Sequence, residues 1–89
     1  MENRKSLCRN IGLFLREARK NKSLSAYQLG CLIKLSQQQV SRYELGVTKI
    51  NIEMLDLFLT ALDKTWSDFF FSVIIHHSDD IKQLKEYGY

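Results

Sequence analysis

The chain has 89 residues, of which 45% are hydrophobic, and this size corresponds to one small domain. It contains no proline and only four glycines, which favours uninterrupted helices, so we predict an all-α fold. Its two cysteines, Cys8 and Cys31, are too few for a disulfide framework or a four-ligand zinc site. We recognise no targeting segment, and no apolar run is long enough to span a membrane, which predicts a cytoplasmic protein without membrane contact.

Charge is distributed unevenly along the sequence. Residues 1–50 hold ten Lys and Arg against three Asp and Glu, a net charge of +7, whereas residues 51–89 carry a net charge of −4. Because the basic half also contains the most polar of the predicted helices, we expect one side of the molecule to bind a polyanion. A solvated basic surface is the alternative that composition alone leaves open.

The first predicted helix covers residues 7–22, where Leu7, Ile11 and Leu15 recur at helical spacing. The polar residues 1–6 before it are expected to fray. Leu13 and Phe14 widen the apolar stripe beyond what a core face needs, which suggests that one of them faces a second subunit. Four cations near the C-terminal end of this helix interact favourably with the helix dipole and suit a nearby phosphate: Arg16, Arg19, Lys20 and Lys22.

A second helix begins at Ser25, which forms a capping box with Gln28. Gly30 in its middle suggests that another helix crosses closely there. Only residues 34–35 separate it from the next helix, and two short helices joined by so tight a turn form a helix-turn-helix. The apolar residues of this helix are Leu29, Leu32 and Ile33.

The third predicted helix, residues 37–45, is the most informative one. Ser36 and Gln39 form a second capping box, and Gly46 fits the left-handed position that ends a helix. At 100° per residue, Val40 and Glu44 share the face that points to the core. The other face carries amides, a hydroxyl and a guanidinium, which hydrogen-bond base edges in the major groove: Gln37, Gln38, Ser41 and Arg42.

The remaining segments alternate loops and short apolar helices. After a loop over residues 47–50, Asn51 caps a fourth helix at residues 52–63, and Thr65 with Asp68 starts a short fifth helix. Residues 71–75 fit either a strand or a continued helix, and residues 79–87 fit a final helix. The apolar face expected for the fourth helix consists of Ile52, Leu55, Phe58, Leu59 and Leu62.

Three segments carry a recognisable pattern: Leu24-Ser25-(x3)-Leu29-Gly30, then Leu35-Ser36-Gln37-Gln38-Gln39-Val40-Ser41-Arg42-Tyr43-Glu44-(x)-Gly46, then Ile52-(x2)-Leu55-(x2)-Phe58-(x2)-Ala61-Leu62. Over about residues 11–70 this pattern resembles the phage Cro and repressor family of helix-turn-helix proteins. The resemblance implies a five-helix bundle like that of the lambda repressor, with a third helix that enters the major groove. The glutamine-rich stretch and Phe69-Phe70-Phe71 also resemble bacterial regulators of fimbrial operons.

The resemblance implies roles for the positions that match the family pattern. Gln37 and Gln38 fall where the family reads bases, and Ser41 and Arg42 fall where it reaches bases or adjacent phosphates. Arg19 and Glu44 match a buried ion pair between the first and third helices. The other positions expected to contact DNA, mostly its sugar-phosphate backbone, are Ser25, Lys34, Ser36, Gln39, Thr48 and Lys49.

The chain departs from the family pattern at three positions. Ala26 replaces a glutamine that contacts phosphate, which implies that one backbone contact is missing. Ser23 stands where the family often has glycine, and Ile50 stands where it often has proline. These two changes affect loops rather than the face that reads DNA.

Several residues have a second interpretation. Capping competes with base contact at Gln39, and we favour the cap; at Tyr43 we favour a packed ring over a hydroxyl that binds phosphate. The sequence His76-His77-Ser78-Asp79-Asp80 has metal-ligand chemistry, but adjacent histidines point apart on a helix or a strand, so we predict no metal. We also expect no cofactor and no enzymatic activity, because no nucleophile-base set or glycine-rich phosphate cradle is present.

The sequence therefore predicts a sequence-specific regulator of transcription that binds double-stranded DNA. We divide it into a DNA-binding domain at residues 1–70 and a C-terminal extension at residues 71–89. The extension is expected to join a homodimer through Phe69, Phe71, Val73, Ile74 and Ile75, because so many large apolar side chains exceed what one short helix end can bury. The second hypothesis is an antitoxin-like module whose acidic, apolar half binds another regulatory protein.

Overall fold

The computed structural model describes residues 2–75, with side chains from Leu7 onward, and each regular element in this range is helical. The helices are α1 (Glu2–Asn21), α2 (Ala26–Ile33), α3 (Gln37–Leu45), α4 (Ile52–Ala61) and α5 (Trp66–Phe69), and a π-helical turn, η1 (Phe70–Ile74), continues α5. The prediction of an all-α, five-helix fold is confirmed. Residues 71–75, which fitted either a strand or a helix, are helical.

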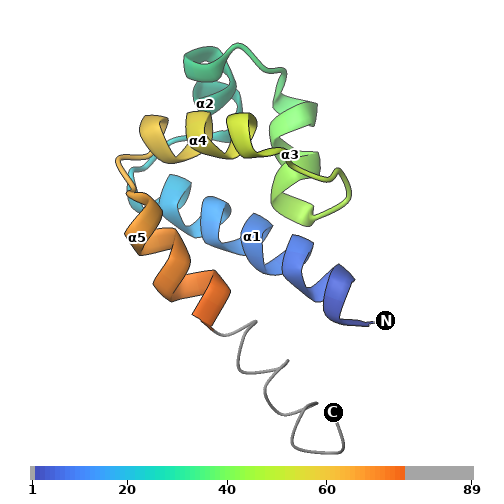
Figure 1. Ribbon diagram of the computed structural model, residues 1–89. Helices are drawn as coiled ribbons and strands as arrows, with labels where there is room; N and C mark the ends of the chain where they lie inside the picture. The colour runs from blue at the N-terminus through green and yellow to red at the C-terminus, as the bar shows by residue number, and fades with distance from the viewer. Residues whose placement is uncertain (1, 76–89) are drawn as a thin grey trace, which may run out of the picture.

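The long helix α1 lies through the middle of the bundle (Figure 1). Helices α2, α3 and α4 lie on one side of it, and α5 with η1 lies on the other side. Helix α3 packs against both α1 and α2, while η1 packs against α1. The helix-turn-helix formed by α2 and α3 therefore rests on α1, which the C-terminal helices cover from the opposite side.

The core is formed by one side of each helix. Leu15, Leu29, Val40 and Phe58 are fully buried, so α1, α2, α3 and α4 each contribute to a single apolar cluster. Burial of this kind stabilises the fold by roughly 1.5–3 kcal/mol for each large side chain. One predicted core residue is wrong, because Ile52 is 70% exposed at the first position of α4, where the helix has not yet reached the core.

Helix α1 begins earlier than the sequence indicated. Residues 2–6 were expected to fray, but α1 starts at Glu2, because a polar turn without apolar residues leaves no periodic signal in the sequence. Helix α1 uses its wide apolar stripe in two ways. Phe14 meets Phe69 edge to face, with ring centroids 5.8 Å apart, whereas Leu13 is 52% exposed.

Two glycines allow close approach of backbone segments. A Cβ atom added at Gly12 would lie 2.2 Å from the carbonyl oxygen of Glu44, so α1 and α3 cross with almost no space between them. At Gly30 the nearest atom would be the Leu35 carbonyl oxygen, at 2.4 Å. The close neighbour of Gly30 is therefore the turn that leads into α3, and the expectation that another helix crosses there was wrong.

Two predictions concern residues 76–89, which lie outside the part of the chain that the structure describes. These are the final helix at residues 79–87 and the interpretation of the segment from His76 to Asp80. Within the described residues, no helix is both long enough and apolar enough to cross a membrane. The same residues contain no cluster of three or more His, Cys, Asp or Glu side chains with metal-site geometry.

Candidate nucleic-acid interface

The turn between α2 and α3 is held by backbone hydrogen bonds. Lys34 adopts a left-handed conformation with φ of 62° and ends α2, where its N–H donates to the Gly30 carbonyl. The Leu35 N–H donates to the same carbonyl at 2.9 Å. Ser36 then opens α3, so the two helices are joined by a turn with no flexible segment, and the position of α2 determines the direction of α3.

Both ends of α3 are capped as the sequence indicated. The Ser36 hydroxyl accepts a hydrogen bond from the Gln39 N–H at 3.1 Å, and the Gln39 side-chain oxygen accepts one from the Ser36 N–H at 2.9 Å. At the other end, Gly46 has φ of 75° and donates its N–H to the carbonyls of Arg42 and Tyr43. Such caps matter in a nine-residue helix, which is too short to be stable in isolation.

The two faces of α3 differ sharply in burial. Val40 is fully buried and Glu44 is 6% exposed, so both lie against the rest of the bundle. The side chains of Gln37, Gln38 and Arg42 are exposed. Helix α3 therefore presents a row of two amides and a guanidinium to solvent, with Leu45 at its end, on a backbone that its caps and its core face fix in place.

Ser41 lies at the border between these faces. It is half-buried and lines a small cleft between α1 and α3 together with Arg16, Arg19, Glu44 and Leu45. The sequence predicted that Ser41 points outward with the other polar residues of this helix. Helical periodicity gives the direction of a side chain around the helix axis, but it does not show which directions a neighbouring helix covers. In the structure its hydroxyl belongs to the edge of the exposed face that adjoins α1.

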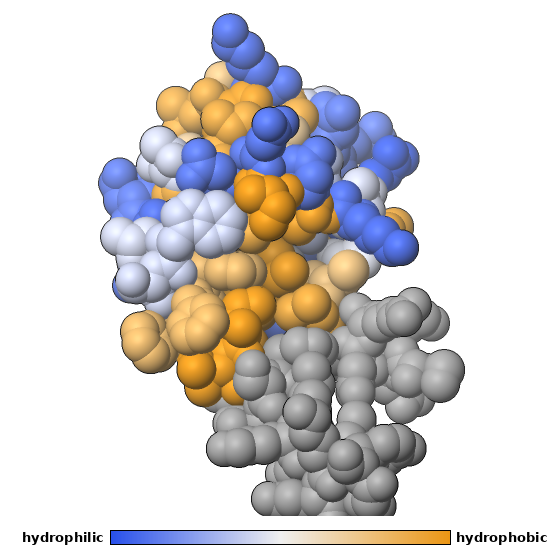
Figure 2. Space-filling model, viewed as in Figure 1, coloured by the Kyte–Doolittle hydropathy of each residue, from blue (hydrophilic) through white to orange (hydrophobic). Residues whose placement is uncertain are grey.

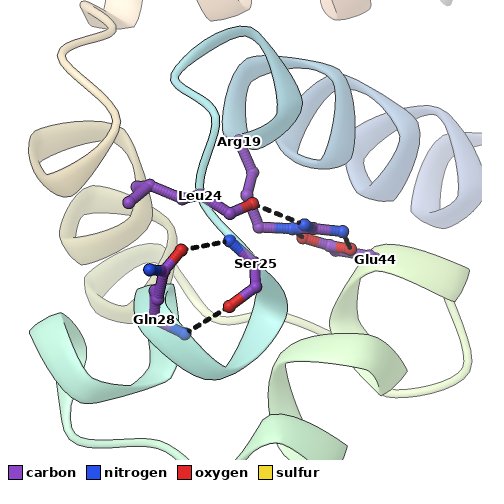
Figure 3. Close-up of polar contacts among 5 residues, drawn as sticks. All are labelled: Arg19, Leu24, Ser25, Gln28 and Glu44. Atoms are coloured by element: carbon purple, nitrogen blue, oxygen red, sulfur yellow. Dashed lines mark hydrogen bonds and ion pairs between the residues drawn. The ribbon is translucent and has the colours of Figure 1, made fainter.

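An ion pair joins α1 to α3 beneath this face (Figure 3). The Arg19 guanidinium donates through Nε to one Glu44 oxygen at 2.7 Å and through a terminal nitrogen to the other at 2.9 Å. Its second terminal nitrogen donates to the Leu24 carbonyl at 2.8 Å. The hydrogen bond to Glu44 raises the pKa of Arg19 above its ordinary value, so the pair stays charged and ties α3 both to α1 and to the segment before α2.

The start of α2 offers backbone donors beside α3. Ser25 and Gln28 form a capping box, with bonds of 2.8 Å and 3.0 Å (Figure 3). Both side chains are exposed, and α2 carries no acidic residue in its first turn, so its N-terminus keeps its positive end free for an anion. Other candidate contacts lie around α3: Lys34, Ser36 and Lys49 are exposed, and Thr48 is half-buried.

Two residues with competing interpretations are placed by the structure. Gln39 makes both hydrogen bonds of its capping box, which is the role favoured by the sequence. Its side-chain oxygen therefore already accepts one hydrogen bond, while its amide nitrogen can donate to another partner. The Tyr43 ring is half-buried and packs edge to face on Phe58, with centroids 5.7 Å apart, so Tyr43 serves as a packed aromatic.

The residues predicted to join a dimer do not form one surface. Phe69 and Val73 are 5% and 2% exposed, because α5 and η1 lie along α1 and bury one side of the apolar segment in the core. Their assignment to an association surface was wrong. Phe71 is 67% exposed, Ile75 is 36% exposed and Ile74 is half-buried. Phe70, which was not among the predicted dimer residues, is 46% exposed.

An exposed apolar region nevertheless remains at this end of the bundle. Figure 2 shows hydrophobic residues gathered over the end of the described chain, where α5 and η1 lie in Figure 1. A groove in this region is lined by Trp66, Ser67, Phe69, Phe70, Phe71 and Ile74. Its lining residues belong to α5 and η1, which lie on the side of α1 opposite to α2 and α4 (Figure 1), and thus away from the helix-turn-helix.

The fold and the exposed face of α3 define a helix-turn-helix protein whose second motif helix presents a polar face to solvent. A family model described as helix-turn-helix matches residues 15–69, which is more than half of the chain. The chain therefore belongs to the helix-turn-helix family of the Cro and repressor type, and it is a DNA-binding transcription regulator. No curated protein and no solved structure matches the sequence.

Proposed function

We propose that this protein is a sequence-specific regulator of transcription that binds double-stranded DNA as a homodimer and reads the major groove with α3. The observation that carries the proposal is the exposed row of Gln37, Gln38 and Arg42 on a short helix with two capped ends. Glutamine amides pair with adenine, and arginine pairs with guanine, each through two hydrogen bonds. The caps and the Arg19–Glu44 pair fix the backbone of this helix before binding, so binding has to order only the exposed side chains.

The remaining candidate contacts would position the protein on the DNA backbone. The free N-terminus of α2 with Ser25, and the cations Lys34 and Lys49, suit phosphate oxygens on either side of α3. Ser36 and Thr48 add hydroxyl groups beside them. Contacts of this type give affinity without sequence preference, so specificity would rest on the residues of α3 itself.

Selection from a random pool of duplex DNA tests the proposal. The purified protein is expected to enrich one sequence, and the enrichment should survive an increase in salt, because base contacts are less sensitive to salt than phosphate contacts. A homodimer should enrich a palindrome or near-palindrome, with half-sites about 10 bp apart or a multiple of that distance. Binding that fades with salt and enriches no sequence would contradict the proposal.

The homodimer is supported by the apolar region at the end of the described chain. Exposed Phe70, Phe71 and Ile75 extend over more than one helical turn, and Leu13 is exposed on the neighbouring helix α1. We assign DNA binding to residues 1–70 and dimerisation to residues 71–89 together with this region. Sedimentation of the wild-type chain should give a dimer at micromolar concentration, and Phe71→Glu should shift it to a monomer; a wild-type monomer would contradict the assignment.

A second candidate function uses the same apolar region. Its groove, lined by Trp66, Phe70 and Phe71, would suit another regulatory protein, as in antitoxins that neutralise a partner. Purification from the native cell would then return a stoichiometric partner, which Phe71→Glu should release. The resemblance to regulators of fimbrial operons is a narrower prediction, which identification of the bound genomic sites would test.

A further inference from the structure

The cleft between α1 and α3 lies directly beside the face proposed to read DNA. It is lined by Arg16 and Arg19 from α1 and by Ser41, Glu44 and Leu45 from α3. Ser41 follows Gln38 by three residues and precedes Arg42, so its hydroxyl borders the exposed row of α3. Arg16 faces the same cleft from the other helix, and its side chain is exposed.

The charges of this cleft do not balance. Both oxygens of Glu44 accept hydrogen bonds from Arg19, whose remaining terminal nitrogen donates to the Leu24 carbonyl. The one carboxylate of the cleft is therefore engaged by Arg19. Among the described side chains, the ion pairs are Arg19 with Glu44 and Lys22 with Asp63, so Arg16 has no acidic partner there.

Arg16 also belongs to a basic edge of α1. Arg9, Arg16 and Lys20 recur at spacings of seven and four residues, which places them along one side of a helix. All three are exposed. This edge adjoins α3, because Gly12 contacts the backbone of Glu44 and a Cβ atom added at Gly46 would lie 3.0 Å from the Cα atom of Arg9.

We propose that Arg16 and Ser41 together bind one phosphate of the DNA backbone beside α3, an inference that rests on the proposed function. A guanidinium matches the geometry of a phosphate group with two parallel hydrogen bonds, and a serine hydroxyl donates a third. A phosphate is the suitable partner because Arg16 extends from α1, which lies outside the inserted helix, and because Ser41 is half-buried at the border of the exposed face that adjoins α1. This contact makes α1 part of the DNA-binding surface.

Binding of Arg16→Ala to two duplexes tests the inference, one being the sequence selected by the wild-type protein and the other a scrambled duplex of equal length. Loss of one phosphate contact per protomer should weaken binding to both by the same factor. It should make the slope of log K against log salt shallower by about 1 for each bound protomer, and thus by about 2 for a dimer. Between ~50 and ~200 mM salt, the variant should lose ~3- to 4-fold less affinity than the wild type for each bound protomer, or ~12-fold less for a dimer. The matched control is Lys64→Ala, which removes one charge on the connection between α4 and α5, away from α3.

Two further variants connect the effect to a shared phosphate. Ser41→Ala should also weaken both duplexes equally, and in combination with Arg16→Ala it should weaken binding by less than the product of the two single effects. Arg16→Lys should retain the salt slope but bind less tightly, because an ammonium cannot form the paired hydrogen bonds. Thermal unfolding of each variant shows whether the fold is intact before binding is compared.

The outcomes separate the inference from the proposed function. A slope for Arg16→Ala equal to that of Lys64→Ala overturns the phosphate contact, and so does a loss confined to the selected duplex, which would indicate a base contact. If the wild type prefers no duplex, the proposed function fails, but the salt slope on scrambled DNA still decides whether Arg16 binds phosphate.

Discussion

Within residues 2–75, three residues other than glycine adopt left-handed backbone conformations, all in the connections between helices. Ser23 has φ of 59°, Lys34 has φ of 62° and Asp63 has φ of 57°. For residues with a Cβ atom this conformation is costly, by about 1–2 kcal/mol. Ser23 stands where the resembling family often has glycine, which adopts this conformation without steric cost.

We expect Ser23→Gly to stabilise the protein. The substitution removes the steric cost of the left-handed conformation, and part of this gain is offset by the greater freedom of glycine in the unfolded chain, leaving about 0.5–1 kcal/mol. Chemical denaturation measures the free energy of unfolding. Asn21→Gly, in the last position of α1, is the matched control and should destabilise instead, since that residue is in right-handed helix.

Asp68 gives a second prediction at this scale. Its carboxylate accepts a hydrogen bond from the Thr65 N–H at 2.9 Å, and this bond together with that of the Thr65 hydroxyl lowers the pKa of Asp68 below its ordinary value. A lowered pKa in the folded state stabilises the fold above the ordinary value of about 4, and this contribution is lost as pH falls through the folded-state pKa.

Thermal unfolding between pH 6 and pH 2, compared for the wild type and Asp68→Asn, measures this contribution. The wild type should lose more stability than the variant as the solution is acidified, because asparagine keeps an acceptor but does not titrate. Parallel curves for the two proteins would show that Asp68 has the same pKa in the folded and unfolded chains.

At the scale of the elements, the caps of α3 separate stability from DNA binding. Ser36 caps the helix and is also a candidate DNA contact, so its substitutions should affect the two properties differently. Asparagine and aspartate are both good N-cap residues, and each should retain the stability that Ser36→Ala would lose, about 1 kcal/mol. Of the two, only aspartate places a negative charge where DNA is expected.

Ser36→Asp should therefore be as stable as the wild type but bind duplex DNA much more weakly. Ser36→Asn should retain nearly the stability and the DNA affinity of the wild type. The two side chains are almost the same size, so the difference between them isolates the charge. Equal binding of the two variants at low salt would place DNA away from the N-terminus of α3.

Besides its caps, the Arg19–Glu44 ion pair holds α3 in place. The Glu44 and Arg19 side chains are 5% and 11% exposed, so loss of one partner leaves a nearly buried charge without compensation. We expect Arg19→Met to destabilise the protein by about 3 kcal/mol, and the double substitution Arg19→Met with Glu44→Leu to cost less than this single change. A full set of four unfolding curves gives the coupling energy, and additive effects would mean that the pair contributes nothing of its own.

Elements that depend on local sequence could be predicted well. The capping boxes at Ser25, Ser36 and Thr65 formed as expected, because each involves residues only three positions apart. The exposure of Gln37 and Gln38 followed from helical periodicity in the same way. The outward face of α3, which is most of the candidate site, could therefore be derived from the sequence.

Features that depend on packing between distant segments could not be predicted. Gly12 gave no signal, because its role requires knowledge that α3 crosses α1 at that residue. The burial of Phe69 and Val73 likewise depends on α5 and η1 lying along α1, which periodicity within one apolar segment does not reveal. The position of Ser41 in the cleft beside Arg16 belongs to the same class.

At the scale of the whole molecule, the basic and acidic halves of the sequence form different helices. The basic half of the chain contains α1, α2 and α3, whereas α4 and α5 belong to the acidic half, so the surface around α3 favours a polyanion. The exposed aromatic groove lies on the other side of α1. This arrangement would let a protein contact form at the groove while DNA occupies the exposed face of α3.

The central claim is that exposed residues of α3 read the base sequence. The most direct test measures the affinity of Gln38→Ala and Arg42→Ala for the selected duplex and for duplexes that differ from it at a single base pair. We predict that each variant loses about 1–3 kcal/mol of binding free energy per half-site and tolerates any base at one position of each half-site where the wild type does not. For Arg42→Ala, an equal loss on every duplex with a shallower salt slope would mean that Arg42 binds a phosphate instead. Unchanged discrimination at every base pair by both variants would contradict the claim that α3 reads DNA.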